Sequence, residues 1–205
     1  MRLLTASFAL ALTMSAAADN EFLSTWKAPG AGPMDFTGRR VVAMLISDDT
    51  SLRVAAEEAL VREVNARGAN GIAAYRTIPK ELLADKDAAK AWLEKTKTQG
   101  LVILRIVQTD TEKVYSSAVW VSGYYGSAWD YWGYGWGNVY PIGKAREQKV
   151  LTVETLLYDL SKGEPVWAAV TRTTDPKNVE AYVKELAIDI IKRLEKDGVV
   201  AKRPR

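Results

Sequence analysis

Apolar runs and short polar turns follow one another along the chain in a pattern that predicts alternating strands and helices. The continuous apolar run from Val41 to Ile46, stopped by polar residues at 47–51, is typical of a strand buried on both faces. Apolar residues three and four positions apart then predict a helix over 52–67, capped by Thr50 or Ser51. The same two patterns recur as a strand, a helix and a strand over 71–75, 85–98 and 101–108. This βαβαβ order predicts a partly parallel sheet with right-handed crossovers.

The second half of the chain has the pattern of an antiparallel hairpin followed by a helix. Residues 149–160 and 166–174 read as two strands joined by the turn 161–164. Pro176 marks the expected start of a helix whose buried stripe is Val179, Val183, Leu186, Ile190 and Leu194. We therefore predict an α/β (α+β) fold, in which the βαβαβ unit, the hairpin and a C-terminal helix build one mixed sheet with helices packed on it.

The N-terminus is typical of a secretory signal peptide. Arg2 supplies a positive charge, the apolar run from Leu3 to Met14 is too short to span a bilayer, and small residues precede a predicted cut between Ala18 and Asp19. An uncleaved anchor or a buried N-terminal helix is the alternative. We expect a periplasmic or secreted protein without a later transmembrane segment. Its predicted parts are a signal peptide (1–18), an irregular lead-in (19–40), a single α/β domain (41–196) with an insert (114–143), and a basic tail (197–205).

Composition excludes several kinds of chemistry. The 205-residue chain contains no Cys and no His, so Ser-His-Asp and Cys-His catalytic sites, zinc sites built from His or Cys, and disulfides cannot form. The formal net charge of +3 is too small to suggest a nucleic-acid partner.

Two weaker candidates for chemistry remain. Ser24 and Lys27 have the Ser-x-x-Lys spacing in which lysine activates serine, but the companion motifs of such hydrolases are missing. Four carboxylates gather near one predicted helix start: Asp48, Asp49, Glu57 and Glu58. We expect them to cap the helix and line a solvated face, with Arg53 and Glu57 paired there, because the spacing for a calcium or magnesium site is lacking. The prediction is a protein without enzyme activity, cofactor or bound metal.

The insert between the third and fourth predicted strands is unusually aromatic. Its central part, 124–140, holds four glycines, one charged residue (Asp130) and eight aromatic residues, which are the candidate binding residues: Tyr124, Tyr125, Trp129, Tyr131, Trp132, Tyr134, Trp136 and Tyr140. The glycine content argues against a helix there. Three roles stay open for the rings, namely a lid over the sheet or helix edge, a binding surface, or a loop at a membrane interface.

Two stretches resemble small uncharacterised bacterial envelope proteins of domain-of-unknown-function type, many of them lipoproteins. One is the strand-to-helix passage from Val42 to Leu60, and the other is the hairpin with Tyr158, Gly163 and Trp167. The layout is more distantly similar to the N-terminal domain of the translocation protein TolB and to the curli-secretion lipoprotein. The resemblance implies a binding or assembly role in the periplasm or at the outer membrane. It does not carry over lipid anchoring, because this chain has no cysteine.

The leader, the missing catalytic groups and the aromatic density together predict a non-catalytic binding or assembly module of the periplasm or cell envelope that uses its aromatic loop. Its partner would be an envelope protein or a glycan. The alternative is an oligomeric outer-membrane-associated or secretion component, a homo-oligomer whose loop makes peripheral contact with lipid. A hydrolase that depends on Ser and Lys or on a metal is a third, weaker alternative.

Overall fold

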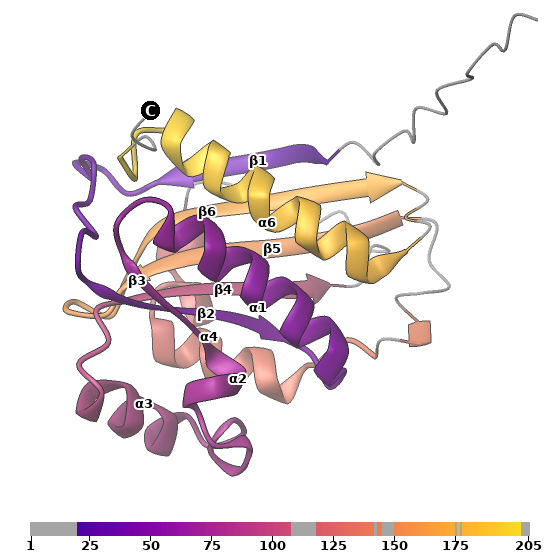
Figure 1. Cartoon of the computed structure of the whole chain (residues 1–205), viewed down its shortest axis with the longest axis horizontal. Helices are drawn as coiled ribbons and strands as arrows, with labels where there is room; N and C mark the ends of the chain where they lie inside the picture. Colours follow the sequence, from indigo (N-terminus) through magenta and orange to yellow (C-terminus); the bar gives the residue numbers. More distant parts are fainter. Residues whose placement is uncertain are drawn as a thin grey trace, which may run out of the picture.

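The computed structural model describes residues 20–107, 118–141, 143–144, 150–174, 176 and 178–201. These residues form one mixed six-stranded sheet with helices packed on it and a C-terminal helix, which confirms the predicted α+β fold (Figure 1). The predicted signal peptide (1–18), its cut site and the end of the basic tail (202–205) lie outside the described residues.

The sheet combines a parallel part and an antiparallel part. Its strands are β1 (Glu21–Lys27), β2 (Arg40–Ile46), β3 (Asn70–Ala73), β4 (Gly100–Val107), β5 (Val150–Asp159) and β6 (Glu164–Thr174). They lie in the order β1-β6-β5-β4-β2-β3. β2 runs parallel to β3 and β4, whereas β4, β5, β6 and β1 pair antiparallel in turn. The predicted parallel unit and the predicted hairpin are therefore both present.

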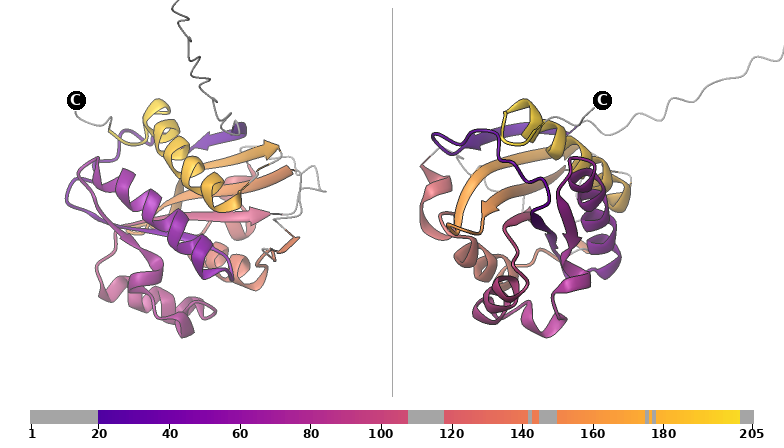
Figure 2. Two further views of the ribbon diagram at one scale, coloured as in Figure 1. Left: turned by 45° about the vertical axis from the view of Figure 1, so that its right-hand side comes forward. Right: turned by 60° about the vertical axis from the view of Figure 1, so that its left-hand side comes forward.

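Helices cover both faces of the sheet (Figures 1 and 2). One face, which we call the α6 face, carries α1 (Thr50–Asn65) and α6 (Val179–Lys196). The opposite α4 face carries α3 (Lys86–Lys95) and α4 (Ala128–Gly137). Shorter helical turns are α2 (Ala74–Thr77), η1 (Lys80–Leu82), η2 (Val119–Val121) and η3 (Gly123–Tyr125). Among the described residues, no helix has the length and apolar content needed to cross a bilayer.

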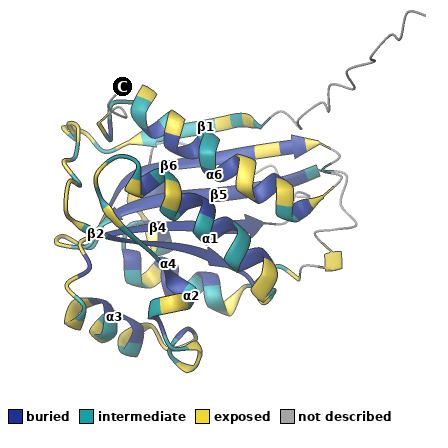
Figure 3. Ribbon diagram, viewed as in Figure 1, coloured by how far each residue is buried: buried dark blue, intermediate teal, exposed yellow. Residues whose placement is uncertain are grey.

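The core consists of two apolar clusters, one on each face, and the inner strands β2, β4 and β5 between them are largely buried (Figure 3). The stripe predicted for the last helix lies buried on the α6 face: Val179, Val183, Leu186, Ile190 and Leu194. On the α4 face, Ala89 and Leu93 of α3 pack with Met44 of β2 and Leu156 of β5. Since β2 and β4 serve both clusters, they are buried on both faces, as their continuous apolar runs predict.

The predicted irregular lead-in (19–40) is wrong for its first part, which forms the edge strand β1. The register of β1 against β6 shifts between Phe22 and Ser24, and the intervening Leu23 is 40% exposed. Phe22 consequently packs on the α6 face and Trp26 on the α4 face. This shift breaks the alternation of apolar and polar positions by which a strand is recognised, so the sequence pattern conceals β1.

Two helices begin at residues other than those predicted. Asp49 caps α1, and its carboxylate accepts a hydrogen bond from the Leu52 N–H at 2.9 Å, so the cap lies just before the two predicted residues. α6 begins at Val179 with Asn178 as its cap, and Pro176 therefore precedes the helix. In both helices an Asp or Asn in extended conformation satisfies a free backbone N–H of the first turn, which decides where the helix starts.

The predicted boundary between the domain and its basic tail at 197 is also wrong. Val199 is fully buried in the cluster of the α6 face, and Val200 forms an isolated parallel bridge with Met34. The apolar contacts of Val199 extend the domain past the end of α6, although the sequence shows only a short apolar pair before basic residues.

The aromatic insert contains a helix, contrary to the prediction from its glycines. α4 is capped by Ser127, whose hydroxyl accepts hydrogen bonds from the N–H groups of Trp129 and Asp130. Gly135 lies so close to β2 that a Cβ built on it would be 2.3 Å from Cδ1 of Ile46. Glycine there costs about 1 kcal/mol of helix propensity. It allows the helix backbone to approach the sheet, and this packing outweighs the local preference.

We expect Gly135→Ala to lower the free energy of unfolding by about 1 to 3 kcal/mol, because the added methyl group would overlap Ile46 in a packed core. Gly137→Ala is the matched control in the same helix, since its added Cβ would meet no described atom within 4 Å outside its chain neighbours and its own helix backbone. The control should be neutral or stabilising by up to about 1 kcal/mol. Urea unfolding measures both variants, and Ile46→Val should partly rescue Gly135→Ala because it removes the overlapping carbon. Equal stabilities of the two glycine variants would contradict this account of α4.

Candidate functional site

The candidate site is the aromatic layer that covers the α4 face of the sheet. Of the eight predicted binding residues, Tyr125, Tyr131 and Trp132 are buried in the cluster of this face. The other five are half-buried: Tyr124, Trp129, Tyr134, Trp136 and Tyr140. Tyr140 packs against the cluster of the α6 face, so the structure does not bring it together with the other rings. The aromatic segment is thus a packed layer with a partly exposed outer side.

Ring stacking joins the two halves of the aromatic segment. Tyr124 of η3 stacks on Tyr134 of α4 with 3.7 Å between ring centroids and 13° between ring planes. Beneath them, Tyr125 stacks on Tyr131 at 5.5 Å. Trp120, which the sequence reasoning missed, is 1% exposed and meets Tyr125 edge-on at 4.9 Å. These stacked and edge-on contacts hold η2, η3 and α4 as one unit.

A buried ion pair lies under this layer. Glu154 of β5 and Arg105 of β4 are register partners, and the Arg105 Nη2 donates to the Glu154 carboxylate at 2.9 Å. Glu154 also accepts hydrogen bonds from the hydroxyls of Tyr125 at 2.5 Å and Tyr131 at 3.0 Å. Sequence reasoning missed both charged residues. The available signal was one charged residue in the interior of each of two largely apolar strands, since a charge is almost never fully buried without a partner.

The environment raises the pKa values of the tyrosine hydroxyls and of the guanidinium in this cluster. Burial, reinforced by the charge of Glu154, raises the pKa of the Tyr125 and Tyr131 hydroxyls, so both remain hydrogen-bond donors. Burial alone would lower the pKa of Arg105, but Tyr131 and Glu154 more than offset this and raise it overall. Burial also raises the pKa of Tyr158, whose hydroxyl donates to the Tyr125 carbonyl at 2.9 Å. This arrangement fixes the orientation of the rings.

Arg105 also supports the end of α4. Its guanidinium lies 4.8 Å from the Tyr134 ring centroid, and Nη1 contacts the Asn138 carbonyl, at the helix C-cap, at 3.5 Å. A cation at this end of a helix is favoured by the helix dipole. One buried residue of β4 therefore contacts Glu154 in the sheet and two positions of the aromatic segment.

We expect Glu154→Gln to lower the free energy of unfolding by about 3 to 5 kcal/mol, because it leaves the Arg105 charge buried without its counter-ion. Glu21→Gln is the matched control, since Glu21 also pairs with an arginine, Arg172 at 3.4 Å, but both side chains are largely exposed. The control should change stability by less than about 0.5 kcal/mol. Chemical unfolding followed by near-ultraviolet circular dichroism measures both, and similar losses in the two variants would contradict a central role for the buried pair.

The prediction of a solvated helix face is wrong for Glu57. This side chain of α1 is 0% exposed, and it accepts hydrogen bonds from the backbone N–H groups of Leu45 at 3.1 Å and Tyr75 at 2.8 Å. β3 ends at Ala73, level with Ala43 of β2, so the next part of β2 has no strand partner on that side. The carboxylate takes the place of the missing strand. Its predicted partner, Arg53, is also buried, so the pair does not lie on an exposed face.

Glu57 gives stability a pH dependence of defined sign. Burial raises its pKa from the ordinary 4.5 to about 7. Between these values the folded protein binds the proton more tightly than the unfolded chain, so this group's contribution to stability falls as the pH rises from 4.5 to 7, by at most about 3 kcal/mol. Glu57→Gln should remove that decline when unfolding is measured at pH 5 and pH 8. The exposed Glu94 of α3 gives a control, Glu94→Gln, which should retain it.

A decline of the same size in Glu57→Gln as in the parent protein would contradict the assignment of this pH dependence to Glu57.

The weaker candidates for chemistry are not brought together. Lys27 donates to the Asp197 carbonyl at 3.0 Å, beside the end of α6. Ser24 is two residues from Trp26 in β1 and shares its side of the strand, which is the α4 face. Of the four clustered carboxylates, Asp49 caps α1 and Glu57 is buried between strands. Within the residues that the structure describes, no group of three metal-ligating side chains is present.

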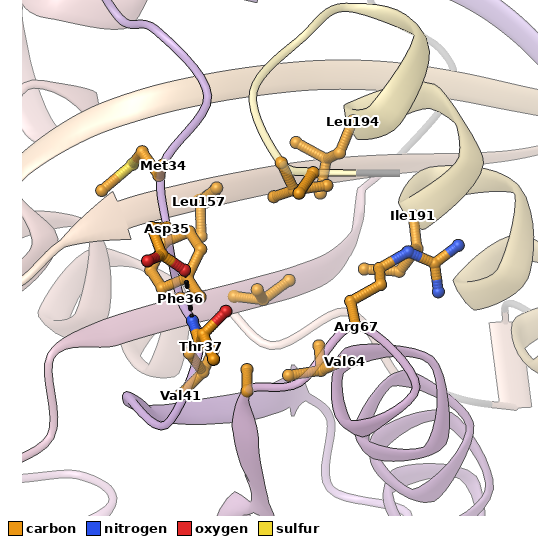
Figure 4. Close-up of a pocket in the computed structure, with 14 residues that line it drawn as sticks. Met34, Asp35, Phe36, Thr37, Val41, Val64, Arg67, Leu157, Ile191 and Leu194 are labelled. Carbon is orange, nitrogen blue, oxygen red and sulfur yellow. Dashed lines mark hydrogen bonds between the residues drawn. The ribbon is translucent and has the colours of Figure 1, made fainter. Parts of the chain in front are cut away.

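A small cavity lies beside Val41, at the amino end of the parallel strand β2 (Figure 4). It holds about 40 Å³ between the segment 34–37, the ends of α1 and α6, and Val41. Its lining is largely apolar, and Arg67 at its edge is already paired with Glu63 at 2.9 Å and Glu195 at 2.7 Å. Cavities that hold cofactors or similar ligands measure about 300 to 1,000 Å³, so this one is a packing gap.

The similarities of this chain to known proteins are weak. No family model matches the chain, and no curated protein sequence matches it. Among solved structures, it is similar to the PelC dodecamer from Paraburkholderia phytofirmans, with 13% identity and a TM-score of 0.46 over 90% of this chain and 100% of that chain. A point variant of the same PelC dodecamer gives 14% identity and a TM-score of 0.45 over 83% and 98%. Similarity at this level says nothing about what the present protein does.

Proposed function

We propose that this protein is a non-catalytic binding or assembly module of the bacterial cell envelope, which offers the half-buried rings of its aromatic layer to an envelope protein or a glycan. The observation that carries the proposal is the way the layer is held. A buried ion pair, two tyrosine hydroxyls and stacked rings fix it on the sheet, while Tyr124, Trp129, Tyr134 and Trp136 keep part of their surface exposed.

Rings held in this way suit recognition. Binding costs free energy when side chains and loops must become ordered, and a layer that is already ordered avoids most of that cost. Tyrosine and tryptophan are also enriched among the residues that dominate interface energies, and their flat faces suit sugar rings as well as peptide groups. Next to the layer, Val121 of η2 is 58% exposed, so the apolar surface continues beyond the rings.

A homo-oligomer is the second candidate, and one observation favours it. β1 is an edge strand, and its Leu23 is exposed at the register shift. Edge strands present free backbone groups to other chains, and an exposed leucine there would add apolar contact area. Sedimentation velocity distinguishes this candidate from the first, because it predicts a concentration-dependent mass that Leu23→Lys lowers to that of one chain.

Loss of the outer ring pair tests the main proposal. Tyr124→Ala with Tyr134→Ala removes both stacked rings together, and we expect binding to weaken about tenfold or more, as for residues at the centre of an interface. The measurements are co-sedimentation with purified peptidoglycan sacculi and, in cells, photo-crosslinking from position 134. Phe22→Ala with Tyr75→Ala is the control, because these rings are also half-buried but lie outside the aromatic layer.

The expected result is that the control pair binds sacculi, or crosslinks, like the parent protein. Circular dichroism must show that both variants are folded. If the parent protein neither sediments with sacculi nor gives a crosslink from position 134 above that from exposed Arg62, the proposal is overturned. Flotation with phospholipid vesicles that depends on the ring pair would favour the lipid-contact alternative instead.

A further inference from the structure

The carboxyl ends of β2 and β4 form the edge at which open α/β sheets commonly bind ligands. β2 is parallel to both of its neighbours, β3 and β4. The connection from β2 to β3 runs through α1 on the α6 face, and the connection from β3 to β4 runs through α3 on the α4 face. Connections that leave on opposite faces open a crevice between the two strands at their carboxyl ends. α1 starts at this edge, directly after β2.

Arg53 in the first turns of α1 is buried at this edge with free hydrogen-bond donors. The residue is 8% exposed, and its Nε and Nη2 are buried without an acceptor among the described residues. These two nitrogens form the side edge of the guanidinium, whose parallel N–H groups fit the two oxygens of a carboxylate or phosphate. A buried guanidinium with that edge unused is unfavourable, because it has lost its hydration without replacement.

Glu57 does not fill this role, although it lies one helical turn away. Its Oε1 is 3.5 Å from Arg53 Nε, without the alignment of a hydrogen bond. Both of its oxygens are instead held by the backbone N–H groups of Leu45 and Tyr75. The helix N-terminus is likewise occupied, since the Asp49 carboxylate caps it. An anion at this edge would therefore be bound by side chains.

Trp136 of α4 adds a further free donor at the same place. Its ring centroid lies 5.4 Å from Cζ of Arg53, so α4 from one face and α1 from the other meet at the end of β2. Its indole Nε1 is buried and has no acceptor among the described residues. Arg105, which holds the same end of α4, has a fourth such donor in its Nε. Buried donors of Arg53, Trp136 and Arg105 thus lack an acceptor at this edge. Because Arg105 is already paired with Glu154, the guanidinium of Arg53 is the group that would attract an anion here.

We infer that the edge between Arg53 and Trp136 is a binding site for a single oxyanion group, a carboxylate or a phosphate, which Arg53 grips through Nε and Nη2 and Trp136 contacts through its indole N–H. A sugar acid, a peptide carboxylate or a phosphate ester would present this group. The inference shares Trp136 with the aromatic layer but does not use the stacked pair Tyr124 and Tyr134, so the variants that test the two proposals are different ones.

Nuclear magnetic resonance of the indole N–H groups tests the site directly. The chain has seven tryptophans, and Trp136→Phe assigns the relevant signal by its loss. At constant ionic strength, inorganic phosphate and glucuronate are titrated separately, with chloride as the background. We expect the Trp136 signal to shift saturably with at least one of them, at a half-saturating concentration on the order of 1 mM. The two titrations distinguish a phosphate from a carboxylate ligand.

Variants of Arg53 show whether its Nε and Nη2 groups are responsible for the binding of the anion. Arg53→Lys keeps the charge and removes the side edge, and it should weaken binding about tenfold, as should Arg53→Gln if that variant folds. Arg62→Gln is the matched control, because Arg62 lies on the same helix but is exposed, and it should bind like the parent protein. Shifts that stay linear in both titrations, or equal affinity in Arg53→Lys and the parent protein, would overturn the inference.

Discussion

The burial of one ion pair between two neighbouring strands determines how the rest of the α4 face is built. Arg105 and Glu154 face each other across β4 and β5, and neither is more than 3% exposed. Charges in such a position are costly unless every polar atom that can be partnered is partnered. The hydroxyls of Tyr125 and Tyr131 donate hydrogen bonds to the Glu154 carboxylate, and the end of α4 contacts the Arg105 guanidinium. The aromatic segment is therefore part of the core, because without it the pair would be exposed and the Glu154 carboxylate would lose two of its hydrogen bonds.

The sequence pattern was sufficient wherever local periodicity agrees with tertiary packing. The run from Val41 to Ile46 and the stripe from Val179 to Leu194 lie where their patterns place them, since burial on two faces or on one helical side leaves a direct trace in the order of residues. β1 was not predicted, because its register shift at Leu23 interrupts the alternation of apolar and polar residues. α4 could not be predicted in the same way, because Gly135 disfavours a helix by its propensity. Only its close contact with Ile46 of β2 explains why a glycine is present there.

The candidate site was predictable in its residue types and not in its arrangement. The eight clustered rings indicate the segment 124–140 as the candidate site. Their packing into a layer depends on Glu154 and Trp120, which lie outside that range. Arg105 and Glu154 become partners only through the register of β4 and β5, which is a long-range property. Glu57 shows the same limit, since its burial follows from the short length of β3 and not from its position on α1.

The two proposed binding surfaces share α4, and this has a physical consequence. The helix presents Tyr134 to the outer stacked pair and Trp136 to Arg53 at the end of β2, two residues apart on different sides of one rigid element. Between them, Gly135 packs directly on Ile46, so the helix cannot move at one surface without disturbing the sheet contact. A ligand at the sheet edge would therefore meet a helix position that the buried ion pair already fixes. The outer rings and the sheet edge are best regarded as two surfaces of a single preorganised scaffold.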